Sequence, residues 1–317
     1  MLSSSSAPSV AIVGAGAMGC LFAARLAEQG APVTLVDVDR ERLSIIGRDG
    51  IALVDDNGSR TVAVRAALAG EVTEPVDLVL LFTKGTHSAP AIRSVAHLAA
   101  ARPVALTLQN GLGNAELLAE SFGAERVLLG TAHVPADLTG PASVVTHGFG
   151  TLELGGLTAA AQKYAPACAA LLQRAGFATK VASDVNAAVW EKVAFNAALN
   201  AVGMICQVPN AGVDNDPGRR LAVRVVAETV NVAAARGLRL DRERIVATID
   251  AALREHAHHK ASMLQDRELI RPTEIEMING AIAREGARLG VPTPVCDTFT
   301  DLVRIIELAS GSGSGNQ

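Results

Sequence analysis

Aromatic residues and charge are both scarce in this chain. Aromatic residues make up 3% of its 317 residues, and the formal net charge is −4. Proteins that bind single-stranded nucleic acid stack its bases on aromatic side chains, and any nucleic-acid surface needs basic residues to neutralise phosphates. We therefore expect no nucleic-acid partner and no electrostatic attraction to an acidic membrane surface.

Cysteine is also rare, and long apolar runs are missing. The four cysteines (Cys20, Cys168, Cys206 and Cys296) form no Cys-x-x-Cys pair, so we expect neither a metal site nor a disulfide framework. No apolar run approaches the ~20 residues that span a bilayer, and the serine-rich start lacks the basic region of a secretory signal. These features favour a cytoplasmic protein that does not associate with membranes.

What the chain does have, close to its start, is a β-turn-α pattern typical of dinucleotide binding. The apolar run 10–13 leads into Gly-x-Gly-x-x-Gly, and an alanine-rich helical pattern follows. The first glycine permits the turn, the second lets a pyrophosphate approach the backbone, and the third lets the helix pack on the strand. The helix N-terminus then attracts the phosphates. We expect the cofactor to contact Gly14, Ala15, Gly16, Ala17, Met18 and Gly19.

The next predicted strand, 33–37, ends in an acidic residue. A carboxylate at this place typically binds the adenosine ribose, which favours NAD and repels the 2′-phosphate of NADP. Two further possibilities stay open. Asp37 could instead cap the helix that begins near Asp39, and Arg40 could turn onto a 2′-phosphate. The cofactor is thus NADP or NAD, and Asp37 favours NAD.

Further strands continue the pattern of a parallel sheet covered on both faces. Apolar runs at 77–84, 104–108 and 127–131 predict buried strands, and shorter strands at 51–54 and 61–64 flank a turn. Lys84 and Asn110 follow two of these runs, at the sheet edge where ligands bind in open α/β folds. Asn110-Gly111 is, however, also a common turn pair. An alternating pattern over 143–155 predicts an antiparallel addition to the sheet.

Strand signals nearly vanish beyond residue 183, and helical periodicity takes over. It predicts helices over 185–206, 217–236, 241–256, 274–289 and 293–308. The predicted fold class is α/β plus all-α. We expect a Rossmann-type NAD(P)-binding domain over 8–183, a helical substrate and catalytic domain over 184–309, and flexible ends at 1–8 and 310–317.

A row of polar residues marks the first helix of the second domain. Lys192, Asn196 and Asn200 recur every four residues and share one side of the helix, amid almost wholly apolar neighbours. A buried polar group without a partner costs about 1–3 kcal/mol. One interpretation is structural: the row faces solvent, or its asparagines bond within a core network. The other is functional: the row faces a cleft, burial lowers the pKa of Lys192, and Lys192 donates a proton there.

Taken nearly end to end, the chain resembles the ketopantoate reductase family. The resemblance rests on the glycine loop, Lys84, 109–113, 190–192 with Asn196 and Asn200, 209–210, 262–266 and 273–280. It implies a Rossmann-type domain followed by a helical domain. It also implies reduction of a 2-keto acid by a nicotinamide cofactor, with 2-dehydropantoate as the default substrate in pantothenate biosynthesis.

The resemblance also implies roles for single residues. Lys192 would be the general acid that protonates the keto oxygen, and a developing alkoxide does need such a fixed donor. Glu274 would act near the cofactor and the substrate hydroxyls, although 273–276 also fits a helix capping box that uses Glu276. Asn110, Lys192, Asn196, Asn200, Asn210 and Ser262 would bind the substrate, and Lys84, Asn110, Ala136 and Glu274 would line the cofactor path.

Three positions depart from the family pattern. Val38 stands where NADP-using members often carry arginine, and His258-His259-Lys260 stands before Ser262, where an asparagine meets pantoate. His133 lies in a variable loop for which we have no account. These departures keep open a different keto acid, or a more acidic one, or an imine as substrate, with NADH preferred.

A metal site and a non-enzymatic role have less support in the sequence. No carboxylate or cysteine set accompanies the histidine pair, so we expect no metal. A non-enzymatic dinucleotide-binding redox sensor would not need Lys192 and its row. The sequence gives no direct handle on oligomeric state, and a homodimer is one of the states it allows.

Overall fold

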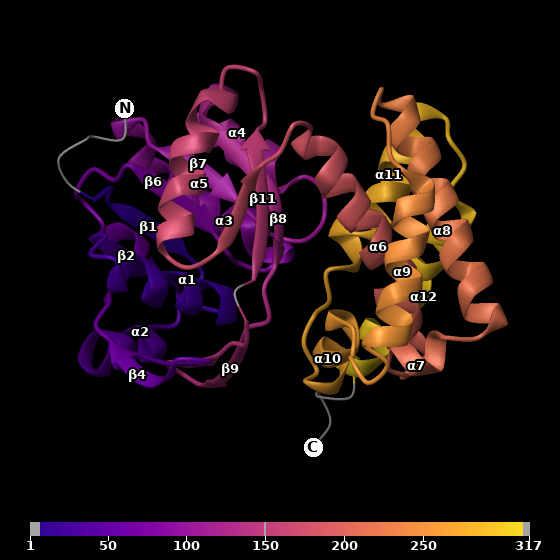
Figure 1. Ribbon diagram of the computed structural model, residues 1–317, viewed down its shortest axis with the longest axis horizontal. Coiled ribbons are helices and arrows are strands. Elements are labelled where there is room, and N and C mark those ends of the chain that lie inside the picture. The colour runs from indigo at the N-terminus through magenta and orange to yellow at the C-terminus, as the bar shows by residue number, and fades with distance from the viewer. Residues whose placement is uncertain (1–6, 149, 313–317) are drawn as a thin grey trace. The chain divides into compact units, whose positions relative to one another are not determined.

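The structure, a computed structural model, describes residues 7–148 and 150–312, whose contacts divide the chain into two units (Figure 1). Unit 1 contains the residues up to Gln109 together with Asn114–Val185, and unit 2 contains Asn110–Gly113 and the residues from Asn186 onward. The main change of unit falls after Val185, whereas the sequence places it at 183–184. The assignment of Asn110–Gly113 to unit 2 has no counterpart in the predicted boundaries.

Unit 1 is built on an eight-stranded sheet whose central strands are parallel. Its order is β12 (Ala178–Val181), β11 (Thr151–Gly156), β8 (Val127–His133), β7 (Val104–Thr107), β6 (Leu78–Leu81), β1 (Val10–Val13), β2 (Val33–Val36) and β5 (Arg65–Ala67). All residues of β1, β2, β6 and β7 are buried, which explains their apolar sequences. β11 runs antiparallel to β8, as the alternating pattern predicts.

A second sheet of four strands has the order β4 (Gly58–Val62), β3 (Ile51–Asp55), β10 (Ser143–Val145) and β9 (Asp137–Gly140). The β3–β4 hairpin matches the two short strands expected around the turn. The pattern over 143–155 divides between two sheets, because β10 pairs with β3 whereas β11 joins the large sheet. This split was not predicted.

An ion cluster ties the second sheet to the first helix. The Asp55 carboxylate, 3% exposed, receives Arg60 at 2.8 Å and lies 3.7 Å from Arg25 of α1 (Ala17–Glu28). Arg60 also pairs with Glu28 at the end of α1. The other helices of unit 1 are α2 (Arg40–Asp49), α3 (Ser88–Ser94), α4 (Asn114–Phe122) and α5 (Ala165–Arg174).

Unit 2 has only helices and helical turns as regular elements among its described residues. Its elements are α6 (Val185–Cys206), α7 (Asn210–Val213), α8 (Asp216–Ala235), α9 (Arg242–Glu255), α10 (Ser262–Glu268), the 3₁₀ turn η6 (Ile275–Met277), α11 (Asn279–Leu289) and α12 (Pro294–Ser312). Asn215 and Asp241 cap α8 and α9 by accepting backbone N–H groups, and Gly237, at φ +82°, follows the end of α8. Over the described part of the chain, no helix has the length and apolar character that a membrane span requires.

Two expectations for unit 2 need correction. The helix predicted over 274–289 is interrupted at Ile278 (φ −110°, ψ −94°), so that η6 precedes α11. The capping box does not form, because the Glu276 carboxylate pairs instead with Arg284 and Arg304. In addition, α12 continues to Ser312, into the predicted tail, and residues 1–6 and 313–317 of the expected flexible ends lie outside the described residues.

Candidate active site

The glycine loop has the geometry that its spacing predicts. Gly14 has a φ of +107°, and a Cβ there would lie 2.8 Å from the backbone of Phe82. A Cβ on Gly19 would lie 1.8 Å from the Gly14 carbonyl oxygen, so this glycine lets α1 pack on the turn. A Cβ on Gly16, in contrast, would meet no atom within 4 Å. The second glycine is therefore the open point of the loop, as a site for a pyrophosphate requires.

A cavity of about 600 Å³ opens beside this loop in unit 1. It brings together four of the predicted cofactor residues, namely Gly14, Gly16, Asp37 and Lys84. They follow the carboxyl ends of β1, β2 and β6, where an open α/β sheet binds its ligand. The volume and position suit a dinucleotide.

The other predicted cofactor residues are placed differently. Ala15 is fully buried, and Met18 and Ala136 are partly buried against the core of unit 1. Ala17 is the first residue of α1. A cofactor would thus meet Ala15 through its backbone rather than its side chain.

Asp37 is bonded to the glycine loop. Its Oδ2 accepts the Ala15 N–H, and its Oδ1 accepts the N–H groups of Val38 and Asp39 at 2.7 and 3.0 Å. Asp39, not Asp37, caps α2, since its side chain accepts the Arg42 N–H. The capping role considered for Asp37 is therefore wrong.

Sequence reasoning missed Arg42. Its Nη1 donates to the Ala15 carbonyl at 2.8 Å, so the N–H and the carbonyl of Ala15 are bound by Asp37, just after β2, and by Arg42, in the first turn of α2. The sequence signal that could have identified Arg42 is its position three residues after Asp39, in the first turn of the predicted helix. Arg40, the arginine that the sequence singles out, is exposed at the surface.

The polar row of α6 faces inward. Asn196 and Asn200 are 9% and 6% exposed, and Lys192 is partly buried, so the interpretation of the row as a solvent-facing stripe is wrong. The Asn200 Nδ2 donates to the Ser262 Oγ at 3.3 Å. Two of the predicted substrate residues, from α6 and α10, therefore meet directly.

Lys192 has a strongly shifted acidity. Burial lowers the pKa of its ammonium group to about 8, and the nearby Glu274 carboxylate partly opposes this by raising it. A lysine with this pKa holds a proton near neutral pH but releases it far more readily than an exposed one. Such a group can act as a general acid.

The Asn110–Gly113 loop belongs to this part of unit 2. The Leu112 N–H donates to the Met277 carbonyl at 2.8 Å, and the Met277 N–H donates to the Glu274 carbonyl at 3.0 Å. Gly111 has a φ of +89°, and a Cβ there would lie 2.5 Å from the Met277 carbonyl oxygen. The loop therefore lies against the segment that carries Glu274.

Asn210, another predicted substrate residue, is bonded to α9 through its side chain. Its Nδ2 donates to the carbonyls of Ala252 and His256, at 3.3 and 3.1 Å, at the C-terminal end of α9. The histidines at 258 and 259 are exposed, and Lys260 pairs with Glu268 at 2.7 Å. Among the described residues, no group of three or more His, Cys, Asp or Glu side chains is arranged to hold a metal ion.

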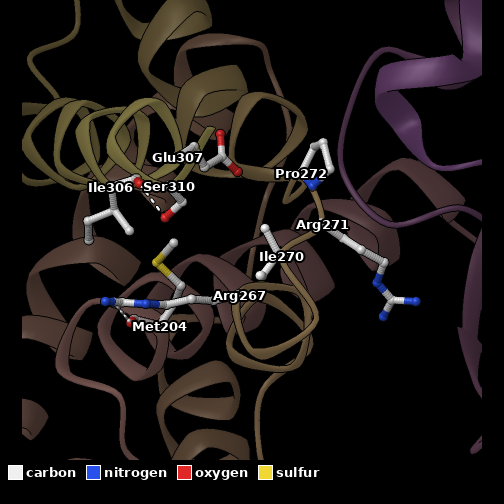
Figure 2. Close-up of a pocket in the computed structure, with 8 residues that line it drawn as sticks. All are labelled: Met204, Arg267, Ile270, Arg271, Pro272, Ile306, Glu307 and Ser310. Atoms are coloured by element: carbon white, nitrogen blue, oxygen red, sulfur yellow. Dashed lines mark hydrogen bonds between the residues drawn. The ribbon is translucent and has the colours of Figure 1, made fainter. Parts of the chain in front are cut away.

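A smaller cavity of about 180 Å³ lies elsewhere in unit 2 (Figure 2). Two of its polar groups bond within its own wall, Arg267 to the Met204 carbonyl and Ser310 to the Ile306 carbonyl. Its Glu307 carboxylate accepts the Thr273 N–H at 2.7 Å. The link between this cavity and the candidate site is therefore Glu307, which holds the backbone of Thr273, the residue before Glu274.

Comparison with known proteins gives a consistent picture. The family model "Ketopantoate reductase PanE/ApbA" matches residues 10–159, and the model of its C-terminal part matches 184–307. The chain is 33% identical to a 2-dehydropantoate 2-reductase of Halobacterium salinarum, over 94% of this chain and 98% of that one. The corresponding Archaeoglobus fulgidus protein is 30% identical, over 94% and 97%.

Two solved structures illustrate the similarity in fold. D-mandelate dehydrogenase with NADH and anilino(oxo)acetate matches with a TM-score of 0.90 and 29% identity, over 96% of this chain and 99% of that one. A PanE/ApbA family ketopantoate reductase from Ralstonia eutropha matches with a TM-score of 0.88, the same identity and the same coverage.

The two glycines of the loop should separate folding from binding. Gly16→Ala is expected to leave the thermal unfolding temperature unchanged but to weaken dinucleotide binding about tenfold or more, because the methyl group would stand where the pyrophosphate approaches. Gly19→Ala should lower the unfolding temperature, since overpacking of this kind costs about 1–3 kcal/mol. Thermal melts and fluorescence titrations with NADH and NADPH measure both effects. Unchanged binding by Gly16→Ala would remove this glycine from the cofactor site.

Proposed function

Because the chain belongs to the ketopantoate reductase family of NAD(P)-dependent oxidoreductases, we propose that it reduces a 2-keto acid to the 2-hydroxy acid with Lys192 as proton donor. The observation that carries this proposal is the ammonium group of Lys192, with a pKa of about 8, on the helix face it shares with Asn196 and Asn200. When bound, the nicotinamide cofactor supplies the hydride. The cavity and the open Gly16 fit such a cofactor.

Lys192 performs two tasks in this reaction. Its positive charge stabilises the negative charge that develops on the keto oxygen, and its proton then moves from Nζ to that oxygen. Glu274 keeps the ammonium form populated, because its carboxylate raises the pKa of Lys192 against the effect of burial. Burial favours release of the Lys192 proton and Glu274 favours its retention, and together they give the pKa of about 8.

Asn196, Asn200 and Ser262 would orient the substrate. The bond between Asn200 and Ser262 holds two hydrogen-bonding side chains together, and Ser262 would donate to the substrate carboxylate. Asn110, on the loop against the Glu274 segment, would complete the set. Asn210 is the weakest member, because its donors are engaged at the end of α9.

We propose NADH as the preferred reductant. Asp37 lines the cofactor cavity with a negative charge, and Val38 beside it is 87% exposed and offers no positive charge to a 2′-phosphate. Each carboxylate oxygen has two lone pairs, so Asp37 can accept a ribose hydroxyl while it holds the Ala15 N–H. The D-mandelate dehydrogenase structure also contains NADH.

A second candidate substrate class is a 2-keto acid with a bulky apolar side chain. It is favoured by the similarity to D-mandelate dehydrogenase, whose structure contains anilino(oxo)acetate. The first candidate, 2-dehydropantoate, is the substrate in the names of the Halobacterium and Archaeoglobus relatives. A panel of both classes with each cofactor, read as kcat/KM, tests the proposal. It fails if no 2-keto acid is turned over.

Replacement of Lys192 tests the proton donor. For Lys192→Ala we expect kcat to fall by about 100-fold or more, as for loss of a general acid. In the wild type, kcat/KM for keto-acid reduction should fall as pH rises through about 8, because the ammonium group then loses its proton. Lys180→Ala, which removes an exposed lysine, is the matched control and should show wild-type kinetics. A Lys192→Ala enzyme that turns over normally would exclude this role.

Replacement of Asp37 tests cofactor choice. The wild type should use NADH with at least about tenfold higher kcat/KM than NADPH, because a carboxylate repels the 2′-phosphate. Asp37→Asn keeps an oxygen for the Ala15 N–H but removes the charge, so the preference should shrink through better use of NADPH. Arg40→Ala should leave the ratio unchanged. A wild-type preference for NADPH that Arg40→Ala abolishes would reverse the assignment.

A further inference from the structure

The segment from Glu274 to Asn279 links the site residues of unit 2 through its backbone. The N–H groups of Met277 and Ile278 both donate to the Glu274 carbonyl, at 3.0 and 3.2 Å, so the turn is closed on itself. At its start, the Thr273 N–H donates to the Glu307 carboxylate of α12. A displacement at one end of this short segment would therefore be transmitted to the other.

Asn279 ends this segment and bonds directly to the lysine helix. It is 0% exposed, and its Nδ2 donates to the Ala197 carbonyl of α6 at 3.1 Å. Ala197 lies between Asn196 and Asn200 in the sequence. The amide also interacts with the Cys296 thiol of α12. One side chain thus fixes α6 against the Glu274 segment.

Stability alone does not explain an amide at this position. Among the described residues, no group forms a hydrogen bond to the Asn279 Oδ1, although the atom is buried. A buried acceptor without a donor is unfavourable, whereas an apolar side chain of similar volume would carry no such penalty. The benefit of the residue must therefore lie in the bond that its Nδ2 makes.

We propose that Asn279 is a positioning residue, which sets the register of α6 against the Glu274 segment and thereby places the Lys192 ammonium group for proton transfer. The proposal rests on the proposed role of Lys192. The chain of contacts is continuous: the turn joins Glu274 to Asn279, the amide joins Asn279 to Ala197, and α6 joins Ala197 to Lys192. Glu274 is the charged group that acts on Lys192, so their separation governs how strongly the proton is held.

The test compares Asn279→Leu with a matched control. Leucine has a similar volume but no donor, and Thr229→Val likewise removes one fully buried donor, the hydroxyl bonded to the Val225 carbonyl of α8. For Asn279→Leu we expect kcat to fall about tenfold or more, because a misplacement of about 1 Å can cost 100-fold in rate. Its dinucleotide affinity and unfolding temperature should stay near wild type. Thr229→Val should keep wild-type kcat.

A second readout does not depend on turnover. Titration of Lys192, followed by NMR of lysine labelled at Cε, should give a pKa near 8 in the wild type and a value at least half a unit lower in Asn279→Leu, because a greater separation from the Glu274 carboxylate removes part of the interaction that raises it. Unchanged kcat and an unchanged Lys192 titration in Asn279→Leu would overturn the proposal. A shifted titration with unchanged kcat would support positioning by Asn279 but contradict catalysis by Lys192.

Discussion

The removal of the Lys192 ammonium group from water, on a helix whose other residues are mostly apolar, is the constraint on which unit 2 depends. Removal of water disfavours the charged form, and the pKa of Lys192 falls to about 8 as a result. Glu274 restores part of the lost stabilisation, but only if its carboxylate is held close to the amine. This explains why its short segment is bound so heavily, by Glu307 before it, by Asn279 after it and by the loop of Leu112 alongside.

A comparable constraint governs unit 1, where three short structures meet at the glycine loop. Gly14 turns away from β1, Gly19 admits α1 against that turn, and Asp37 closes the loop by accepting the Ala15 N–H. Asp37 therefore serves two purposes, and replacing it by a residue of different size would disturb both of them. It shapes the backbone that meets the pyrophosphate, and its charge faces the cavity that would hold the ribose. The cofactor preference that we propose would therefore be coupled to the geometry of the loop through this one side chain.

Features with local causes could be predicted from the sequence. α6 has the bounds expected for it, because the helical periodicity of apolar residues continues over the whole of 185–206. The buried parallel strands and the close approach of Gly19 follow from equally local signals. In each of these cases the residues that determine the feature lie next to one another in the chain.

Features that depend on distant partners could not be predicted in this way. The pairing of β10 with β3 joins residues about ninety positions apart, and nothing in 143–145 distinguishes that partner from the large sheet. The same holds for Asn210, whose amide is engaged by carbonyls of α9, and for the loop Asn110–Gly113, which looks like an ordinary turn until Met277 is seen to bind it. α10, with seven residues, is too short for a clear periodicity.

The buried polar residues of α6 and α11 show where unit 2 departs from a fold built for stability alone. Asn196, Asn200 and Asn279 are all less than a tenth exposed, and each costs more to bury than an aliphatic side chain would. Their amides lie on α6 or bond to it, on the helix that carries Lys192. In the role that we propose for Lys192, its amine must stay at one position, and directional hydrogen bonds restrict movement in a way that apolar packing does not. The cost of these amides is therefore best understood as the cost of holding one amine in place.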